Sequence, residues 1–460
     1  MTTGIDGLVS SLDTTSLINS LIQADAGQQT LLRQQVTSTT SLVTALQGLN
    51  SQVAAAASLA AAAALPTAFD LYAASTSSPD VTATAGTGST TGSIDLVVSQ
   101  LAQSQSSVSA AMTAWPTNPA ALTIVSGGKT TDITPASNSL DDIVSAINNS
   151  AAGVSAMKVA AGVDGSGTPQ YRLQFTSTTT GAASAFSVYQ GTSADVAAGT
   201  ATDLLAQPGA ASLRTAQDAQ LTLWAGTGAQ QTITSSTNTF SSLLPGVSVT
   251  VSATSANPVT VTVARDTSKT AAVASGLVGA LNTVFATIST KSAVVNSTAA
   301  DGTSTVSGGL FTGESSIRSI GQALLSAASA PVNGISPSEI GVSITSTGTL
   351  TFDQDKFSAA LASDPAKVQS MMLEISSRIS AAATLASDPF TGSLTAQITS
   401  QQKVIDGLGV QISDWDARLA TRRASLEQTY AAMEVQLSNL KGQGTNLASQ
   451  LAGLPTWPTA

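Results

Sequence analysis

The side chains available for acid–base or nucleophilic chemistry in this chain are carboxylates, lysines and hydroxyls, because its 460 residues include no histidine and no cysteine. This composition excludes Ser-His-Asp and Cys-His nucleophilic machinery, Cys/His zinc sites and disulfides. A carboxylate pair of the glycosidase type would still be compatible with it. The acidic residues do not cluster in the sequence, however. We therefore predict a protein that is not an enzyme and has no catalytic, cofactor-binding or metal-binding residues.

Two short motifs are similar to ligand-binding loops, and both fit a structural role better. Asp353 and Asp355 are spaced as in a calcium loop, but Ser358 stands where the sharp turn requires glycine. We expect Asp353 to begin a helix instead. Residues 86–92 (GTGSTTG) are similar to a dinucleotide-binding loop, yet the third glycine comes one place late and no strand-to-helix transition follows. This segment is predicted to be a plain loop.

The charge balance argues against nucleic-acid binding. The chain has 17 basic and 27 acidic residues, and no Lys or Arg lies between Arg33 and Lys129, whereas phosphate binding requires clustered cations. The apolar run 53–65 is mostly alanine and too short to cross a bilayer, so no membrane insertion is expected. Residues 1–7 lack the features of a cleaved Sec signal. We expect a cytosolic chain, or one exported without a cleaved leader.

The elements that position the remaining candidate residues begin with a periodic C-terminal helix. An apolar residue recurs at every seventh position there: Ile398, Ile405, Ile412, Leu419, Leu426, Met433, Leu440, Leu447 and Leu454. A strict seven-residue step keeps these side chains on one face only if the helix supercoils, as in a coiled coil or helical bundle. The periodicity is compatible with an intramolecular helical hairpin and equally with an intersubunit bundle.

A second apolar line accompanies the first and changes register. It follows by three residues at Leu408 and Trp415, but by four at Tyr430, Leu437 and Leu451. Arg422 and Arg423 occupy the two candidate positions between them, which indicates a register change or a partner contact. Asp414 with Arg418, and Arg423 with Glu427, are spaced to form ion pairs along the helix. These charges either keep the helix soluble or form a collar that selects a neighbouring subunit, made of Asp414, Arg418, Arg422, Arg423 and Glu427.

The N-terminal region is also predicted to be helical, over residues 5–64. Asp13 can cap a helix that starts near Thr14, and Pro66 ends the second helix. The apolar face of that second helix consists of Leu42, Leu46, Leu49 and Val53. Together with the C-terminal lines, the early helix supplies the candidate assembly seam: Leu8, Leu12, Ile18, Leu21, Ile405, Ile412, Leu419, Leu426, Met433, Leu437, Leu440, Leu447 and Leu451.

The middle of the chain alternates apolar and polar residues, as expected for strands. We predict hairpins around residues 164–167 and 348. We also predict that Val247, Val249 and Val251 pair with Val259, Val261 and Val263 across the turn at Asn257 and Pro258. One helix follows Ser139, whose hydroxyl can cap it.

The order helix, β insertion, helix predicts an α+β multidomain protein in which both termini form a helical, coiled-coil stalk and the β-rich segments form inserted head domains. The predicted segments are residues 1–35, an N-terminal coiled-coil leg; 36–73, the first stalk helix; 74–110 with 210–265, a β-rich head domain; 111–209, an outer β-rich head domain with one helix; 266–424, the second part of the stalk; and 425–460, a C-terminal coiled-coil leg.

The number and order of several segments resemble the flagellar hook-associated protein 2 family, the filament cap proteins, over nearly the whole chain. The similar segments are residues 7–14 (GLVSSLDT), 92–103 (GSIDLVVSQLAQ), 140–148 with 153–156, 172–173 with 180–181, 244–247 (LPGV), 310–318 (LFTGESSIR), 339–342 with 348–353, and 430–451. Ser11 stands where the family usually has glycine.

The resemblance implies a protein exported through the flagellar channel to the distal tip of the bacterial filament. There the family forms a homo-oligomeric ring, commonly pentameric, that retains flagellin and promotes its folding and polymerisation. The implied partners are further copies of the chain, flagellin, the hook-filament junction protein, the flagellar export apparatus and an export chaperone. The alternative is another axial protein of the flagellum, either flagellin or a hook-filament junction protein.

Overall fold

The structure is a computed structural model that describes residues 13–298 and 302–453. Leu8, Leu12 and Leu454 of the predicted seam lie outside these residues. The chain divides into two compact units. The first, which we call the helical unit, consists of Met1–Ala68 and Ala271–Ala460, and the second, the β unit, consists of Phe69–Thr270.

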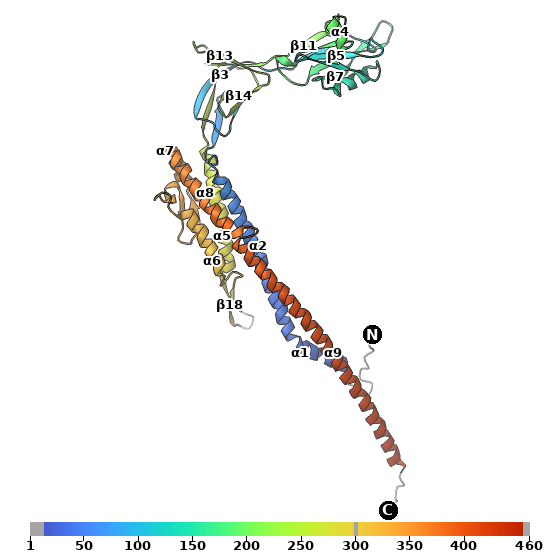
Figure 1. Ribbon diagram of the computed structural model, residues 1–460, viewed down its shortest axis with the longest axis vertical. Helices are drawn as coiled ribbons and strands as arrows, with labels where there is room; N and C mark the ends of the chain where they lie inside the picture. The colour runs from blue at the N-terminus through green and yellow to red at the C-terminus, as the bar shows by residue number, and fades with distance from the viewer. Residues whose placement is uncertain (1–12, 299–301, 454–460) are drawn as a thin grey trace, which may run out of the picture. The chain divides into compact units, whose positions relative to one another are not determined.

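The helical unit contains the long helices from both ends of the sequence and two small hairpins (Figure 1). Its elements are α1 (Thr14–Asp25), α2 (Gly27–Ala63), α5 (Thr267–Ser292, whose first turn belongs to the β unit), β17 (Val294–Thr298), β18 (Ser304–Gly308), α6 (Ser315–Ser329), η2 (Pro337–Ile340), β19 (Val342–Ile344), β20 (Leu350–Phe352), α7 (Gln354–Ser363), α8 (Pro365–Ser387) and α9 (Ser393–Ala452).

Local sequence signals explain how these helices begin and end. The Asp13 carboxylate accepts a hydrogen bond of 2.7 Å from the Ser16 amide at the start of α1, as predicted. Asp353 accepts one of 2.9 Å from the Lys356 amide, so it caps α7 rather than forming a calcium loop. Helix α2 ends at Ala63, three residues before Pro66, as expected because proline cannot continue a helix.

Alternating steps of three and four residues bury one face of α2. Leu46, Leu49 and Val53 are fully buried, and alanines continue the same face as far as Ala63. This face lies against α8 and α9. Each buried leucine or valine stabilises the fold by roughly 1.5–3 kcal/mol relative to an exposed one. The apolar face predicted from Leu42 to Val53 is therefore the surface on which the helical unit packs.

Helix α5 packs one of its faces within the helical unit. It is the one helix among the described residues with the length and hydropathy needed to cross a bilayer. Its Ala274, Leu281 and Val284 are fully buried, and the Asn282 amide exchanges two hydrogen bonds of 2.8 and 2.9 Å with the backbone of Leu350 in β20. Burial along one face is typical of a core helix in a bundle.

The β unit consists of antiparallel sheets. Its strands are β1 (Tyr72–Thr76), β2 (Val81–Ala85), β3 (Gly92–Gln100), β4 (Ser106–Val108), β5 (Leu122–Ser126), β6 (Lys129–Ile133), β7 (Val154–Val163), β8 (Pro169–Ser177), β9 (Phe186–Gln190), β10 (Thr202–Asp203), β11 (Ala211–Arg214), β12 (Ala219–Leu223), β13 (Gln231–Ser235), β14 (Thr239–Leu244), β15 (Val247–Val251) and β16 (Val259–Arg265). Its helices are α3 (Leu140–Asn148), η1 (Ala182–Ser184) and α4 (Ser193–Ala198).

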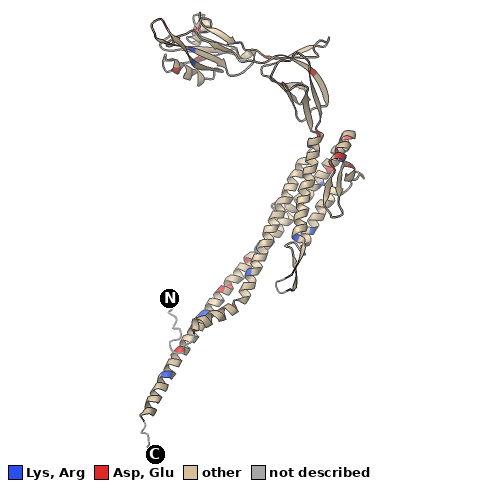
Figure 2. Cartoon of the chain, turned by 180° about the vertical axis from the view of Figure 1, so that it is seen from behind, with Lys and Arg blue, Asp and Glu red and all other residues tan. Residues whose placement is uncertain are grey.

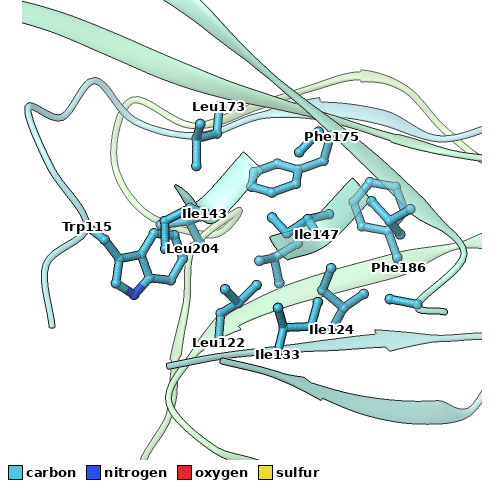
Figure 3. Packing of buried hydrophobic residues seen from close by; sticks show 14 of the residues in the cluster. Trp115, Leu122, Ile124, Ile133, Ile143, Ile147, Leu173, Phe175, Phe186 and Leu204 are labelled. Atoms are coloured by element: carbon cyan, nitrogen blue, oxygen red, sulfur yellow. The ribbon is translucent and has the colours of Figure 1, made fainter. Parts of the chain in front are cut away.

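One core of the β unit lies between two four-stranded sheets and α3 (Figure 3). The sheets have the orders β10-β9-β5-β6 and β11-β4-β8-β7. Ile143 and Ile147 of α3 are fully buried among side chains from both sheets, including Ile124 and Phe175. Ser139 caps this helix by accepting a hydrogen bond of 3.2 Å from the Asp142 amide, as predicted.

The other core of the β unit lies between the five-stranded sheet β1-β16-β3-β12-β13 and the three-stranded sheet β14-β15-β2. The predicted pairing of Val247–Val251 with residues 259–263 is wrong. Strand β15 pairs with β14 and β2, whereas β16 pairs with β1 and β3. The valines of both strands are buried in the same core, so they pack across it from different sheets instead of hydrogen bonding side by side.

The predicted α+β class, with long helices from both ends of the chain and inserted β domains, is confirmed. The two cores of the β unit draw their residues from separate stretches of the sequence. All residues of the first core fall within 115–204, and those of the second fall within 81–102 and 219–263. The predicted head boundaries at 74 and 265 lie a few residues inside the unit Phe69–Thr270.

Candidate functional site

The candidate site is the face of α9 that carries the predicted seam. Helices α1 and α2 both pack against α9. The shielded positions on α9 follow one another in steps of three and four residues, as in coiled-coil packing. From Gln401 onwards these positions are Gln401, Ile405, Leu408, Ile412, Trp415, Leu419, Arg423, Leu426, Tyr430, Met433 and Leu437, of which Leu408 is buried and the others are half-buried. Glu434, next to Met433, is also buried but lies outside this spacing.

Arg423 occupies the point at which the register of this face changes. Two steps of four residues follow one another from Trp415 to Leu419 and from Leu419 to Arg423, which is the pattern of a stutter. The Arg423 Nη2 atom donates a hydrogen bond of 2.8 Å to the Asn19 Oδ1 atom of α1. Arg423 Nη1 also lies 4.0 Å from Glu427 Oε1. Arg423 therefore occupies a seam position at which the apolar spacing is interrupted, and its guanidinium makes a polar contact with α1 there.

The polar contacts between the helices show that α9 runs antiparallel to α1 and α2. Gln29 Nε2 donates a hydrogen bond of 2.5 Å to Asp416 Oδ1, and Arg33 Nη2 lies 3.7 Å from the same oxygen. Further along α9, Arg422 Nε lies 3.8 Å from Asp25 Oδ2. Residues with higher numbers on α9 therefore contact residues with lower numbers on α1 and α2, as expected for antiparallel helices.

Sequence reasoning missed these partners, Asp25 and Gln29, because periodicity shows that a helix has a face without showing which residues oppose it. Acidic and basic positions are interspersed along the helix pair (Figure 2). Exposed ion pairs of this kind contribute at most about 1 kcal/mol each, so the apolar positions account for most of the packing energy.

The five predicted collar residues do not share one environment. The expected ion pair between Asp414 and Arg418 is absent from the ion pairs of the described residues, so this prediction is wrong. The Arg418 guanidinium lies 5.2 Å from the centre of the Trp415 ring instead, in a cation–π contact. Arg422 and Arg423 contact α1 of the same chain, whereas Asp414, Arg418 and Glu427 are exposed.

The predicted seam is exposed in the last turns of α9. Residues 438–453 are all exposed, and Leu440, Leu447 and Leu451 are 63%, 62% and 60% accessible. On α1, Ile18 is buried whereas Leu21 is 39% accessible. An isolated helix with exposed leucines at seven-residue spacing gains little from propensity alone, because most helical stability in proteins comes from packing. Most of the seam residues that lack a packing partner in one chain therefore lie in the last turns of α9, and fewer lie on α1.

The described residues contain no group of three or more acidic side chains placed to hold a metal ion. The carboxylates with lowered pKa values are hydrogen-bond acceptors on strand β6, at the starts of helices and in a turn. For example, hydrogen bonds from the side chains of Ser193 and Thr123 hold the pKa of Asp132 below its ordinary value. An ionised, fully bonded carboxylate of this kind stabilises the local fold and is poorly suited to proton transfer.

Comparisons with known proteins agree along the length of the chain. The family model described as "Flagellar hook-associated protein 2 N-terminus" matches residues 10–105, and the model described as "Flagellar hook-associated protein 2 C-terminus" matches residues 216–442. Similar curated proteins include flagellar hook-associated protein 2 of Escherichia coli O157:H7, 28% identical, and of strain K12, 27% identical. Each alignment covers 96% of this chain and 97% of the relative.

A solved structure is similar in fold as well as in sequence. It is the crystal structure of the D1-D2-D3 domains of the flagellar cap protein FliD from Escherichia coli, which aligns with a TM-score of 0.59 and 25% identity. The alignment covers 78% of this chain and 99% of that chain.

Proposed function

The chain belongs to the flagellar hook-associated protein 2 family, and we propose on this basis that it works as the cap at the distal end of the bacterial flagellar filament. The observation that carries the proposal is that two family models match most of the sequence in the right order, over the segments that form the helical unit and one core of the β unit. Its role is structural: it holds and guides other chains, and its own composition lacks histidine and cysteine nucleophiles.

The cap is proposed to be a homo-oligomeric ring, a pentamer as is common in the family, that retains flagellin and promotes its folding and polymerisation. A ring keeps a confined space open at the filament end, and each arriving flagellin replaces contacts made by the cap. The exposed seam of α9, Leu440, Leu447 and Leu451, suits this exchange, because apolar side chains already at the surface can pack against a new helix without first unfolding the bundle.

Other partners follow from the same assignment. The chain is proposed to leave the cell through the flagellar export apparatus, with an export chaperone before secretion, and to meet the hook-filament junction protein before the first flagellin arrives. Asp414, Arg418 and Glu427 of the collar are exposed, so they are the members proposed to contact a neighbouring subunit. The candidate seam, from Ile405 to Leu451, is proposed to pack against α1 and α2 proximally and against partners distally.

The alternative, another axial protein such as flagellin, predicts a different assembly. A cap must close on itself, whereas flagellin polymerises into an open helical filament. Negative-stain microscopy of the purified full-length chain tests this directly. Closed rings of uniform diameter are expected, and long filaments of the chain alone would contradict the proposal.

A double variant tests the role of the α9 seam. Replacing Leu437 and Leu440 with Asp places two charges on an apolar line that must pack at the filament end, and burying an unpaired charge is strongly unfavourable. Cells carrying the variant should release flagellin monomers into the medium and make few filaments. The matched control is Gln436→Asp with Asn439→Asp, two exposed positions outside the shielded face of α9. Normal filament length with the Leu437/Leu440 variant would show that the seam is not needed.

A further inference from the structure

The turn between α8 and α9 holds a phenylalanine in the solvent. Phe390 is 93% accessible, and Leu385, in the last turn of α8, is 77% accessible. Single exposed leucines are ordinary on protein surfaces, but an almost fully exposed phenylalanine leaves a large apolar area in contact with water. It also lies on the helical unit, well away in sequence from the exposed end of α9.

This turn is rigid, so the exposure of Phe390 is built into the fold. The Asp388 Oδ1 atom accepts hydrogen bonds from the Phe390 amide at 2.9 Å, the Thr391 amide at 2.7 Å and the Thr391 hydroxyl at 2.9 Å. Thr395 Oγ1 donates to the Asp388 carbonyl at 2.8 Å. A Cβ at Gly392 would lie 2.5 Å from the backbone of Asp388, so the turn closes tightly. A turn held this rigidly loses little backbone entropy on binding.

A second exposed apolar feature of the helical unit is the hairpin β17–β18. All ten residues of its two strands are exposed. Val294 pairs with Gly308 and Val306 pairs with Asn296, so the two valines are diagonal neighbours on one face, 56% and 69% accessible. A two-stranded hairpin without a packing partner is at best marginally stable in water.

The base of this hairpin is anchored. The Gly309 amide donates to the Ala293 carbonyl at 2.9 Å, and the Phe311 amide donates to the Lys291 carbonyl at 2.8 Å. Phe311 itself is buried. The valine face is therefore presented from a fixed base, as Phe390 is presented from a fixed turn.

Charges of opposite sign flank the two features. Asp388 lies two residues before Phe390, and Lys291 lies three residues before Val294. Neither side chain takes part in any ion pair in the part of the chain that the structure describes. An apolar patch beside an unpaired acid and an apolar patch beside an unpaired base are complementary surfaces.

We propose that the α8–α9 turn of one copy docks on the β17–β18 hairpin of the next copy, with Phe390 against the face formed by Val294 and Val306 and with Asp388 near Lys291. Because the two surfaces differ, the contact is head-to-tail, and repetition of such a contact closes a ring if the rotation permits. The inference rests on the proposed ring and specifies one of its contacts. Five side chains, two from one copy and three from the other, bury less than the roughly 800 Å² per partner of a standard interface, so this contact sets the position of neighbours and supplements other contacts.

The absence of cysteine allows a direct test by disulfide trapping in the full-length protein. Pro389→Cys leaves Phe390 in place, and Ser304→Cys lies on the same strand face as Val306, two residues away. Under mild oxidation the double variant should give a ladder of covalent dimers, trimers and larger species on a non-reducing gel. An equimolar mixture of the two single variants should stop at dimers.

The matched control combines Pro389→Cys with Thr305→Cys, because Thr305 points to the opposite face of the hairpin. It should crosslink several-fold more slowly. Adding Phe390→Ala to the Pro389/Ser304 pair should slow the ladder by about tenfold, as expected for an aromatic side chain central to a contact. Lys291→Glu should also slow it, whereas Lys291→Arg should not.

The ladder and the proposed function can fail separately. The inference is overturned if the Pro389/Ser304 pair gives no ladder, if the Thr305 control crosslinks equally fast, or if Pro389→Cys alone dimerises as readily, since that would indicate a contact between like surfaces. Rings seen by microscopy without a ladder would leave the cap assignment standing and remove this contact. If the protein gives a ladder but fails to restore filaments in a cap-deficient strain, the contact between copies stands and the cap assignment is removed.

Discussion

At the scale of single residues, the carboxylates of this chain act mainly as fixed hydrogen-bond acceptors. Asp132 on β6 accepts from Thr123 Oγ1 at 2.7 Å, from the Ser193 amide at 2.7 Å and from Ser193 Oγ at 2.6 Å. Thr123 is fully buried, and Ser193 is the first residue of α4. The carboxylate therefore ties strand β5 to helix α4, and these bonds lower its pKa below the ordinary value of 3.8.

The lowered pKa of Asp132 predicts how the β unit responds to acid. The ionised form is stabilised only in the folded state, so its contribution is fully present above the ordinary pKa of 3.8 and is lost as the pH falls through the lower folded value. Asp132→Asn should reduce the free energy of unfolding by about 1 kcal/mol at pH 7 and make it less sensitive to pH below about 4. Urea unfolding between pH 2.5 and 7 measures both effects. An unchanged acid dependence would contradict the prediction.

Residue-level predictions from sequence were correct where the interaction is local. The caps Asp13, Ser139 and Asp353 each bind an amide three residues ahead, so their geometry is set by the sequence itself. The ion pair between Asp414 and Arg418 was wrong because a competing neighbour, Trp415, lies within reach of the same guanidinium. Spacing identifies which contacts are possible, and packing selects among them.

At the scale of elements, the same distinction separates correct hairpins from incorrect ones. The β7–β8 and β19–β20 hairpins form around turns that hold their own hydrogen bonds: Asp164 accepts from the Ser166 amide, and the Thr345 amide donates to the Thr349 carbonyl. The predicted β15–β16 hairpin fails although its valines alternate well. Alternation identifies a buried face but does not specify the hydrogen-bonded neighbour, which here comes from distant strands β2 and β3.

The register change of α9 could be predicted from the sequence, but the residue that Arg423 contacts at this point could not. Nothing in the spacing of apolar residues predicts that Arg423 bonds to Asn19 on α1, because the antiparallel alignment of α1 with α9 is a tertiary property. The role of the seam in assembly stays a prediction. The interrupted spacing at Arg423 nevertheless suggests a testable consequence for α1.

Removal of the Arg423 side chain should loosen α1 specifically. Arg423→Ala removes the hydrogen bond to Asn19 and the aliphatic part of the side chain that packs in the seam, which together should contribute about 1–1.4 kcal/mol, or about five- to tenfold in local opening. Amide exchange of residues 14–25 should accelerate by that factor while α8 is unaffected. Arg418→Ala is the matched control, because that guanidinium lies on Trp415 of its own helix. Equal acceleration in both variants would contradict the assigned contact.

At the scale of the whole molecule, the order of sequence patterns was enough to predict a nested architecture. Helical periodicity at both ends and alternation between them require the chain to leave a helical unit and return to it. The division into Met1–Ala68 with Ala271–Ala460 and Phe69–Thr270 has this form. The presence of two separate cores within the β unit follows from strand pairings between residues more than a hundred positions apart, such as β3 with β12 and β16, which no local pattern specifies.

Nesting predicts that the β unit folds alone. Every residue of its two cores lies within 69–270, and its ends are held together by pairing of β1 with β16 and by the ion pair of 3.0 Å between Asp70 and Arg265. A fragment of residues 69–270 should therefore show a cooperative β-type melt by circular dichroism. Leu96→Asp, which places a charge at a fully buried position, should abolish that melt and serves as the control for specific folding.

The fragment should not restore motility to a cap-deficient strain, because it lacks α1, α2 and α9. An unfolded fragment would mean that the helical unit supplies part of the core, and restored motility would mean that the helices are dispensable for capping.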